Sequence, residues 1–355
     1  MHPVLLSDLD GLFITNPTNV RYLTGFIGVS PEEREAYTLV TAKTTYLFTS
    51  ALYREAAKQF SSAHQQIVEI NYDHPISAAL SAICDKEHIK KLGFEETNLT
   101  VWELHKLQAS LAGVTLIPTH DRVETLRQTK RADELASIRL AASLTDQCFT
   151  YIKQRLKPGV TEGKIAWEIE SFFNDRAGGN AFSPIVAFND HSAMPHYYER
   201  GNNPLRKGSL ILLDIGAKVN GYCADMTRVV FLGAPKDEWV SAYAAVLSAN
   251  EKTLTLLKNG QRNGATLDAA ARGVITGAGF PVYPHSLGHA VGLEIHEAPR
   301  LTVKKTETLK PGMIVTVEPG VYVEGVYGIR IEDLVHIKIN GTELLSKSTK
   351  ELTIL

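Results

Sequence analysis

The chain has 355 residues, of which 44% are hydrophobic and 21% are charged. At ~150 residues per domain, this length favours two domains. The formal net charge of −2 excludes the strongly basic surface expected of a dedicated nucleic-acid binder. Three cysteines without a CxxC pair argue against a disulfide framework and favour a reducing compartment. No signal-peptide pattern and no run of ~18 apolar residues is found, so we expect a cytoplasmic protein without a membrane partner.

The first third of the chain alternates short apolar runs with helix-like segments. We interpret Asn16-Pro17 as a turn that ends the first strand, and Ala42-Lys43 as a hairpin connection. The pattern predicts an α/β domain with a partly parallel sheet, and no cluster of Asp, Glu, His or Cys in it suggests chemistry. The expected strands are 11–15, 36–41, 44–50, 67–70, 90–96 and 114–118, and the expected helices are 51–60, 75–84 and 100–111.

The character of the sequence changes near residues 119–133, which are polar and charged. We therefore place a domain boundary near residue 125, giving domains 1–125 and 126–355. The second domain begins with a long amphipathic helix that Lys157-Pro158-Gly159 ends. The other expected helices of this domain are 161–178, 237–258 and 264–277. Two helix pairs, each followed by strands, suggest an internal duplication.

The first segment that indicates chemistry is LILLDIGAKVNGYCADMTRVVFLG, residues 210–233. Apolar strands flank Asn220-Gly221, which is a strong signal for a two-residue hairpin turn. That turn predicts that Asp214 faces Thr227 and that Asp225 lies one diagonal step away on the same face, ~7–8 Å distant. Two carboxylates so placed are suited to a pair of metal ions. The alternative is that they are ordinary acids near a turn or in salt bridges, although Asp214 follows four apolar residues, where a buried carboxylate needs a partner.

Histidines concentrate in YPHSLGHAVGLEIHEAPR, residues 283–300, which contains His285, His289 and His296. This is not the helical zinc motif HExxH, and its glycines indicate strand or irregular backbone. Neutral imidazole is a common ligand of zinc, manganese and cobalt. The alternative is a solvated loop with surface histidines. A further polar loop, in residues 183–198, carries His191 and His196, and a loop histidine is ordinarily solvent-facing.

The third acidic segment is MIVTVEPGVYVEGVYGIRIEDLVHI, residues 313–337. Glu318 and Glu332 are equidistant from Gly325 and are expected to face one another across a second hairpin, with Pro319-Gly320 bending the strand or forming a bulge. With Asp214, Asp225 and one histidine they form an oxygen-rich set of five ligands. Four clustered carboxylates repel one another unless cations are present. The set fits manganese, cobalt or iron at least as well as zinc.

Together these segments resemble the pita-bread metallopeptidases, specifically the Xaa-Pro dipeptidase (prolidase) and Xaa-Pro aminopeptidase branch. The resemblance covers essentially the whole chain. It rests on four motifs: NVRYLTGF, DIGAKVNGYCADMTR, HSLGHAVGLEIHE and EPGVYVEGVYGIRIED. It implies a creatinase/prolidase-like α/β N-terminal domain, followed by an α+β pita-bread (creatinase/aminopeptidase-like) catalytic domain whose two related halves hold the metals between them.

The resemblance also implies roles for individual residues. Two divalent ions per subunit are expected, Mn²⁺ first and Co²⁺, Zn²⁺ or Fe²⁺ as alternatives. Asp225 and Glu332 would bridge both ions, and Arg330 would brace the bridging carboxylate. Glu318 would also be the general base toward a metal-bridging hydroxide. Other family positions that bind substrate or stabilise the tetrahedral intermediate are matched by His196, His285 and His296. The five implied metal ligands are Asp214, Asp225, His289, Glu318 and Glu332.

The implied activity is hydrolysis of the peptide bond that precedes proline in short peptides. Arg300 falls where prolidases place an arginine suited to the substrate's C-terminal carboxylate, which favours the dipeptidase; alternatively, it is a solvated arginine after a proline. Ala290 replaces the glycine that is commonest after the metal histidine, so we expect a slightly altered pocket. The resemblance further implies a homodimer.

Three other kinds of protein share parts of this pattern. A non-catalytic pita-bread module that binds peptides or proteins would lack one or more of the five ligands, and none is missing here. A creatine-hydrolysing relative has the same two-domain layout but needs no metal. Methionine aminopeptidases share the catalytic fold but usually lack such an N-terminal domain. The complete acidic set therefore favours the Xaa-Pro peptidase.

Overall fold

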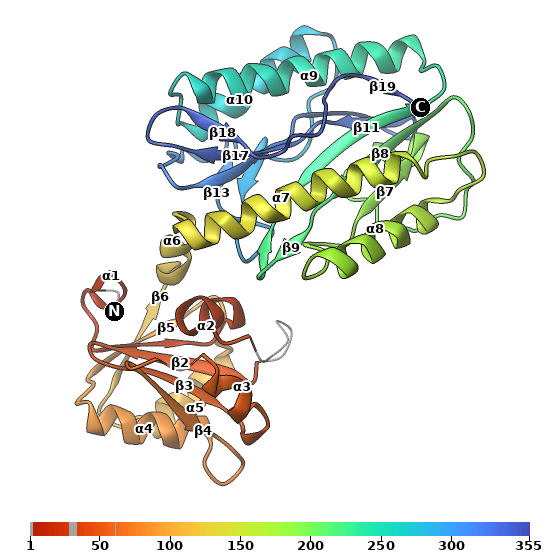
Figure 1. The fold of residues 1–355 in the computed structure, drawn as a ribbon. Helices are drawn as coiled ribbons and strands as arrows, with labels where there is room; N and C mark the ends of the chain where they lie inside the picture. The colour runs from red at the N-terminus through yellow and green to blue at the C-terminus, as the bar shows by residue number, and fades with distance from the viewer. Residues whose placement is uncertain (1–2, 28–33, 61) are drawn as a thin grey trace. The chain divides into compact units, whose positions relative to one another are not determined.

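A computed structural model describes residues 3–27, 34–60 and 62–355 (Figure 1). The chain divides into two compact units, Met1–Arg127 and Gln128–Leu355. Each unit has its own hydrophobic clusters. Within the described ranges, no helix combines the length and the apolar character that crossing a bilayer requires.

The first unit is an α/β structure built on one mixed sheet. Its strand order is β4-β3-β2-β1-β5-β6, with antiparallel pairs around β2 and parallel pairs at both edges. The elements are α1 (Pro3–Leu6), β1 (Gly11–Ile14), α2 (Pro17–Thr24), β2 (Ala36–Thr41), β3 (Thr45–Thr49), η1 (Ala51–Tyr53), α3 (Arg54–Lys58), β4 (Gln65–Glu69), α4 (Ile76–Lys86), β5 (Lys91–Glu95), α5 (Val101–Ser110), β6 (Thr115–Thr119) and α6 (Arg122–Gln128).

Apolar side chains of this sheet alternate between two cores because successive residues of a strand point to opposite faces. In β1, Leu12 and Ile14 join one core with α2 and α3, whereas Phe13 joins the other core with α4 and α5. Every predicted strand and helix of this unit is present within a few residues of its expected bounds.

Three helices of this unit were not expected from the sequence: the short α1, and α2 and α6. The interpretation of Asn16-Pro17 as a simple turn is incomplete, because α2 begins there. The Asn16 side chain accepts hydrogen bonds from the backbone N–H groups of Thr18 and Asn19, and proline occupies the first turn, where its missing N–H costs nothing. The polar stretch 119–133 likewise contains α6, whose buried Val123 packs on the first core.

The second unit carries four longer helices around two main sheets. The sheets have the orders β19-β11-β8-β7 and β13-β12-β14-β17-β18. The elements are α7 (Ala132–Lys153), α8 (Glu162–Arg176), β7 (Ile185–Phe188), η2 (Asn189–Ala193), β8 (Ser209–Ile215), β9 (Lys218–Val219), β10 (Tyr222–Cys223), β11 (Met226–Leu232), α9 (Asp237–Lys258), α10 (Gly264–Gly277), β12 (Gly288–Ala290), β13 (Glu297–Leu301), β14 (Ile314–Val317), β15 (Gly320–Val323), β16 (Tyr327–Arg330), β17 (Asp333–Ile337), β18 (Thr342–Leu344) and β19 (Thr353–Ile354).

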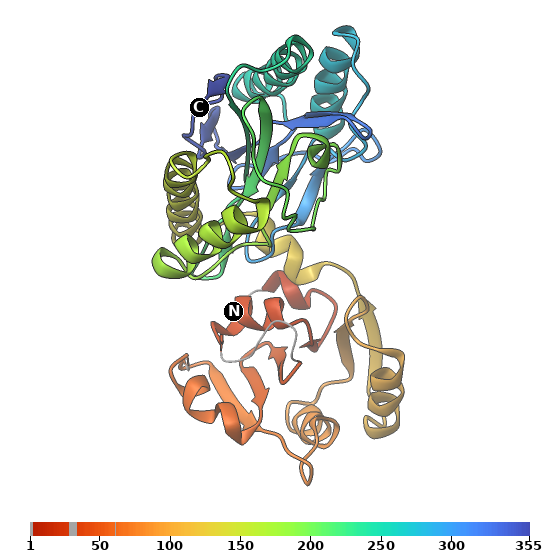
Figure 2. The same ribbon diagram turned by 90° about the vertical axis from the view of Figure 1, so that its right-hand side faces the viewer.

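The sheets lie between two helix pairs, as Figure 2 shows. Helices α7 and α8 cover one face, and α9 and α10 cover the other. In β8, Leu210 and Leu212 pack toward α9 and α10, while Ile211 and Leu213 pack toward α7 and α8. Both faces are therefore apolar, so a charged side chain in the middle of this unit must find partners of its own.

Both predicted hairpins have the expected register. Thr227 pairs with Asp214 in the ladder of β8 and β11, and Asn220 and Gly221 adopt the positive φ angles of 49° and 82° that a two-residue turn needs. The β14–β17 and β15–β16 ladders continue one another, with Val317 opposite Asp333 and Gly320 opposite Arg330. Each hairpin is nevertheless interrupted partway along its length, and the interruptions lie at the acidic residues.

Where the first hairpin is interrupted, its two strands approach too closely for a side chain between them. Strands β8 and β11 stop pairing at Ile215 and Met226, and pairing resumes in β9 and β10. At Gly216 the opposite strand comes so close that a Cβ atom would lie 2.0 Å from the Ala224 carbonyl oxygen. Asp225 therefore stands just outside the regular ladder, next to the place where the strand changes sheets.

Candidate metal centre and active site

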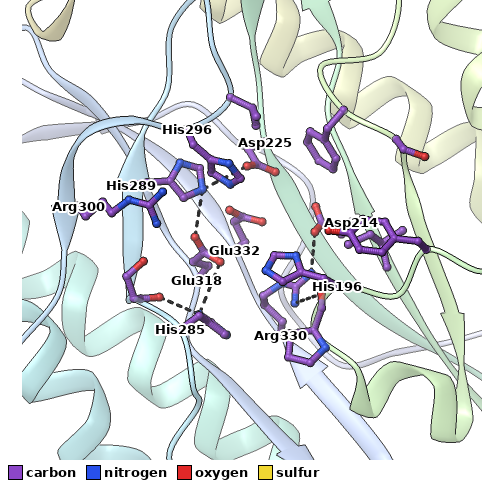
Figure 3. A pocket seen from close by; sticks show the side chains of 17 residues that line it. His196, Asp214, Asp225, His285, His289, His296, Arg300, Glu318, Arg330 and Glu332 are labelled. Atoms are coloured by element: carbon purple, nitrogen blue, oxygen red, sulfur yellow. Dashed lines mark hydrogen bonds and ion pairs between the residues drawn. The ribbon is translucent and has the colours of Figure 1, made fainter. Parts of the chain in front are cut away.

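Four acidic side chains and one histidine converge where the two hairpins are interrupted (Figure 3). Within this group, Asp225, His289 and Glu332 each offer one ligand atom, and these atoms all lie within 4.8 Å of one another. His289 Nε2 is also 3.3 Å from Glu318 Oε1 and 3.7 Å from Asp225 Oδ2. All three members of the closest group are buried. Their atoms are spaced as the ligands of one ion would be.

The tautomer of His289 follows from its hydrogen bonds. Its Nδ1 lies 3.2 Å from the Ala290 carbonyl oxygen, which can only accept, so Nδ1 carries the proton. Nε2, which lies 3.3 Å from Glu318 Oε1, donates to Glu318 when it carries a proton and offers its lone pair to a cation when it does not. The Thr316 hydroxyl fixes the strand beneath by accepting from the His289 backbone N–H at 3.0 Å. This arrangement is the usual one for a metal-binding histidine.

Asp214 is held by Arg330. Arg330 Nη2 donates to Asp214 Oδ2 at 2.6 Å, and both side chains are largely buried. Asp214 Oδ1, also buried, has no hydrogen-bond partner among the residues that the structure describes. A buried carboxylate oxygen without a partner is costly. A cation in the centre would satisfy it, and the oxygen-rich set with one imidazole nitrogen suits divalent ions.

Arg330 connects several groups around the acidic side chains. Besides Asp214, it donates from Nε to Thr227 Oγ1 at 2.9 Å and from Nη1 to the Tyr322 hydroxyl at 2.8 Å and the Pro195 carbonyl at 3.3 Å. The Thr227 hydroxyl in turn donates to Glu332 Oε2 at 2.7 Å. One guanidinium group therefore fixes two of the acids, one directly and one through Thr227.

Burial and mutual repulsion act strongly on the acids. Burial, followed by the charges of Glu332 and Asp214, raises the pKa of Asp225 well above its usual range. Burial, followed by Glu318 and Asp214, does the same to the pKa of Glu332. Burial alone would also raise the pKa of Glu318, but the hydrogen bond and charge of His289, with His285 and Arg330, lower it to about 2. Glu318 is therefore the acid that is most readily ionised.

The remaining histidines differ in environment. His296 stands edge-on to His289 at 4.5 Å between ring centroids, and burial, with the charges of His289 and Arg300, lowers its pKa to about 4. His196 is exposed and stacks on Tyr198. His285 has both ring nitrogens engaged, with the Ser286 carbonyl at 2.8 Å and the Tyr322 hydroxyl at 3.0 Å. Direct contact of His285 with a substrate stays a prediction.

Every residue that the sequence singled out as a site residue lines one cavity of about 180 Å³. Arg300 pairs with His289 across β12 and β13, and its guanidinium makes no hydrogen bond or ion pair within the described part of the chain. The residues concerned are His196, Asp214, Asp225, His285, His289, His296, Arg300, Glu318, Arg330 and Glu332. Their individual roles remain to be tested.

Ala290 does not alter the pocket, contrary to the sequence-based expectation. Its side chain is fully buried in the core beside α9 and α10, and it is not among the residues that line the cavity. The expectation is wrong because successive residues of β12 point to opposite sides. His289 faces the cavity, so its neighbour faces the core.

Sequence reasoning missed Thr227, Tyr322 and Thr316. All three are hydroxyl side chains that position a charged group of the centre. The predicted register gave one usable signal, since it places Thr227 directly opposite Asp214. Nothing in the sequence pattern indicated Tyr322, because its contacts depend on how the second hairpin folds against Arg330.

The fold and the site together define a metallopeptidase of the pita-bread type. The family model for metallopeptidase family M24 matches residues 136–338, and that for the creatinase/prolidase N-terminal domain matches residues 7–129. The chain therefore belongs to metallopeptidase family M24, and it is an enzyme.

Individual relatives agree with this assignment. An uncharacterized peptidase of Bacillus subtilis is 34% identical over 98% of this chain and 96% of its own. The solved Xaa-Pro dipeptidase of Bacillus anthracis has a TM-score of 0.90 and 34% identity, covering 98% of this chain and 95% of its own. The solved X-Pro aminopeptidase of Thermotoga maritima has a TM-score of 0.88 and 30% identity, covering 99% of each chain.

Proposed function

We propose that this enzyme hydrolyses the peptide bond preceding proline in short peptides and depends on two divalent metal ions. The observation that carries the proposal is the convergence of five donor side chains on one cavity, with a buried Asp214 oxygen that lacks a partner. Similarity to an Xaa-Pro dipeptidase and an X-Pro aminopeptidase supports the substrate class.

The donor set fits a dinuclear site. Asp225 and Glu332 would bridge the two ions, with Asp214 on one side and His289 and Glu318 on the other. Mn²⁺ is our first expectation, ahead of Co²⁺, Zn²⁺ or Fe²⁺, because oxygen ligands outnumber nitrogen. When bound, such ions would activate water at neutral pH and offset negative charge on the substrate.

The side chains around the donors would handle substrate and protons. Glu318 lines the cavity beside His289 and would accept a proton from the attacking water. The same proton can then pass to the imino nitrogen of the leaving proline. His296 is neutral because its pKa is lowered to about 4, so it can donate one N–H to the developing oxyanion. The exposed His196 is free to contact the substrate from the opposite wall.

Arg300 would decide between dipeptides and longer peptides. It is an exposed cation at the rim of the cavity, with no hydrogen bond or ion pair to its guanidinium in the described ranges, and the C-terminal carboxylate of a dipeptide is a suitable partner. We therefore favour the dipeptidase over the aminopeptidase.

Replacing Arg300 by alanine tests this assignment. For an Xaa-Pro dipeptide we expect KM to rise ~10- to 100-fold with kcat nearly unchanged, because a charge-assisted hydrogen bond of ~1.5–3 kcal/mol is lost from binding. For the same dipeptide with an amidated C-terminus, the variant and the wild type should be alike. Equal effects on both substrates would show that Arg300 does not bind the carboxylate.

The proposed activity is tested by removing metal with a chelator and restoring Mn²⁺ or Co²⁺. We expect an Xaa-Pro dipeptide to be cleaved only after metal is restored, and an Xaa-Pro-Xaa tripeptide to be cleaved poorly. Preferred cleavage of the tripeptide would make the enzyme an aminopeptidase. Cleavage of neither, with two metals bound, would favour a peptide-binding role instead. A homodimer and a cytoplasmic location also belong to the proposal, and light scattering during size-exclusion chromatography tests the dimer.

A further inference from the structure

The segment between β7 and β8 supplies one wall of the cavity, including Pro195, His196 and Tyr198. Its regular structure is a single 3₁₀ turn, η2 (Asn189–Ala193). Backbone pairing within a sheet therefore does not fix the position of His196. Specific side-chain contacts must hold this segment, which we call the His196 loop (residues 189–201).

Glu162, the first residue of α8, makes such contacts along the whole loop. Its side chain is 1% exposed, and its carboxylate accepts from the Phe188 backbone N–H at 2.7 Å, just before the loop begins. His191 Nδ1 lies 2.8 and 3.0 Å from the two carboxylate oxygens, and the Tyr197 hydroxyl donates to Oε2 at 3.0 Å. Phe188 directly precedes the loop, His191 lies near its start, and Tyr197 directly follows His196.

The close packing around this carboxylate is a second, independent observation. At Gly201, a Cβ atom would lie 2.3 Å from Glu162 Oε2 and 3.0 Å from the Tyr197 hydroxyl oxygen. His191 and Tyr197 also stack, with ring centroids 4.7 Å apart. The backbone at Gly201 therefore covers the Glu162 carboxylate without space for a side chain. This packing leaves the groups bonded to the carboxylate little freedom to move.

The opposite side of the His196 loop is tied to the active site. The Ser192 hydroxyl accepts from the Gly328 backbone N–H at 2.7 Å, and the Pro195 carbonyl accepts from Arg330 at 3.3 Å. Gly328 and Arg330 belong to β16. The loop is thus held between the Glu162 carboxylate on one side and the strand that carries Arg330 on the other.

We propose that Glu162 is a positioning residue that sets the place of His196 against the substrate. The Phe188 N–H can only donate, and His191 and Tyr197 donate to the same carboxylate, so its two accepting oxygens serve all three groups. A glutamine has one accepting oxygen, and its N–H₂ would meet a donor or force Tyr197 to accept instead. Glu162 acts through His191 and Tyr197 and does not line the cavity itself. The inference rests on the proposed function, in which His196 binds the substrate.

The test uses three single variants of the metal-loaded enzyme: Glu162→Gln, Tyr197→Phe and Gly201→Ala. For Glu162→Gln and Gly201→Ala we expect kcat/KM for an Xaa-Pro dipeptide to fall ~10- to 100-fold, because a misplacement of ~1 Å costs about that much. The fall in kcat/KM should be smaller for Tyr197→Phe. When Glu162→Gln is added to His196→Ala, kcat/KM should fall by less than a further ~2-fold. Two changes that act through the same group are not additive.

A matched control is a tyrosine that binds another glutamate of α8. The Tyr151 hydroxyl donates to Glu168 Oε2 at 2.8 Å, a bond of the same kind between α7 and α8, and neither residue lines the cavity. Tyr151→Phe should leave kcat/KM unchanged. Metal content and Tm are measured for every variant, so that a general loss of folding or of metal is recognised.

Hydrogen exchange of backbone amides gives a readout that does not depend on activity. In Glu162→Gln, peptides covering residues 189–201 should exchange faster than in the wild type, with exchange elsewhere unchanged. Unchanged exchange there, or an activity loss that adds fully to that of His196→Ala, would overturn the proposal. If the wild type cleaved no Xaa-Pro substrate, the proposed function would fail, while the exchange result would still decide whether Glu162 holds the loop.

Discussion

Replacing Glu332 by glutamine is expected to reduce activity strongly, to lower the Tm of the metal-loaded protein because a metal ligand is weakened, and to raise the Tm of the metal-free protein. With metal present, kcat/KM should fall by more than ~100-fold, because even the partners of metal ligands contribute 10- to 100-fold. Without metal, the variant should have the higher Tm at pH 7–8, since burial and neighbouring carboxylates raise the pKa of Glu332 well above its usual range. The neutral glutamine relieves that repulsion and can still accept from Thr227.

The pH dependence of this Tm difference follows from the raised pKa of Glu332. A carboxyl group whose folded pKa is raised stabilises the fold below its unfolded pKa, and this contribution is lost as the pH rises through the folded pKa. The Tm advantage of Glu332→Gln without metal should therefore shrink as the pH is lowered from 8 toward 5. Glu343→Gln is the control, because Glu343 does not line the cavity and Arg139 lowers its pKa to about 2. This variant should have a lower Tm at pH 8 with and without metal alike. Equal Tm values for the two metal-free proteins at pH 8 would contradict the expectation.

Replacing Arg330 by methionine is expected to cause the largest loss of stability. The side chain is 4% exposed, and its removal leaves the buried Asp214 without its cation and the Tyr322 hydroxyl without its donor. Breaking a buried ion pair costs about 3–5 kcal/mol. Chemical denaturation measures this loss in the metal-free protein. Activity should also fall, since Asp214 and, through Thr227, Glu332 lose their orientation.

Two further variants separate these effects. Arg330→Lys keeps the positive charge but not the planar fork, so we expect it to recover part of the stability and little of the activity. Arg262→Met is the matched control, because Arg262 donates to the Leu257 and Gly341 carbonyl groups and does not line the cavity. It should lose stability without loss of kcat. Full activity in folded Arg330→Lys would show that a charge alone is sufficient beside Asp214.

The parts of the centre that could be predicted are those set by local rules. The Asn220-Gly221 turn fixes which residues pair on either side of it, so the opposition of Asp214 and Thr227 was correct. The second hairpin was also placed correctly, because Gly325 lies midway between its strands. An acid that follows a buried apolar run must be compensated, and that requirement brought Asp214 and Glu318 to attention from the sequence alone.

The parts that could not be predicted depend on contacts between distant segments. Arg330 meets Asp214, Tyr322 and Pro195 only because the two hairpins and the His196 loop pack together. Glu162 lies far from every motif and has the spacing of an ordinary acid in the first turn of a helix. The helix that starts at Asn16-Pro17 was missed for a different reason, since the same two residues are typical of both turns and helix starts.

The interruptions in the two hairpins also determine where the chain can change in length. An insertion of one residue between Val317 and Glu318 would shift Glu318 relative to β14 and turn it to the other side of the strand. The tip of that hairpin is different: residues 324–326 are exposed, and a Cβ atom at Gly325 would meet nothing within 4 Å. The ladder of β15 and β16 lies between this tip and the acids. Evolution or a protein engineer can therefore lengthen the chain at this tip without moving a carboxylate.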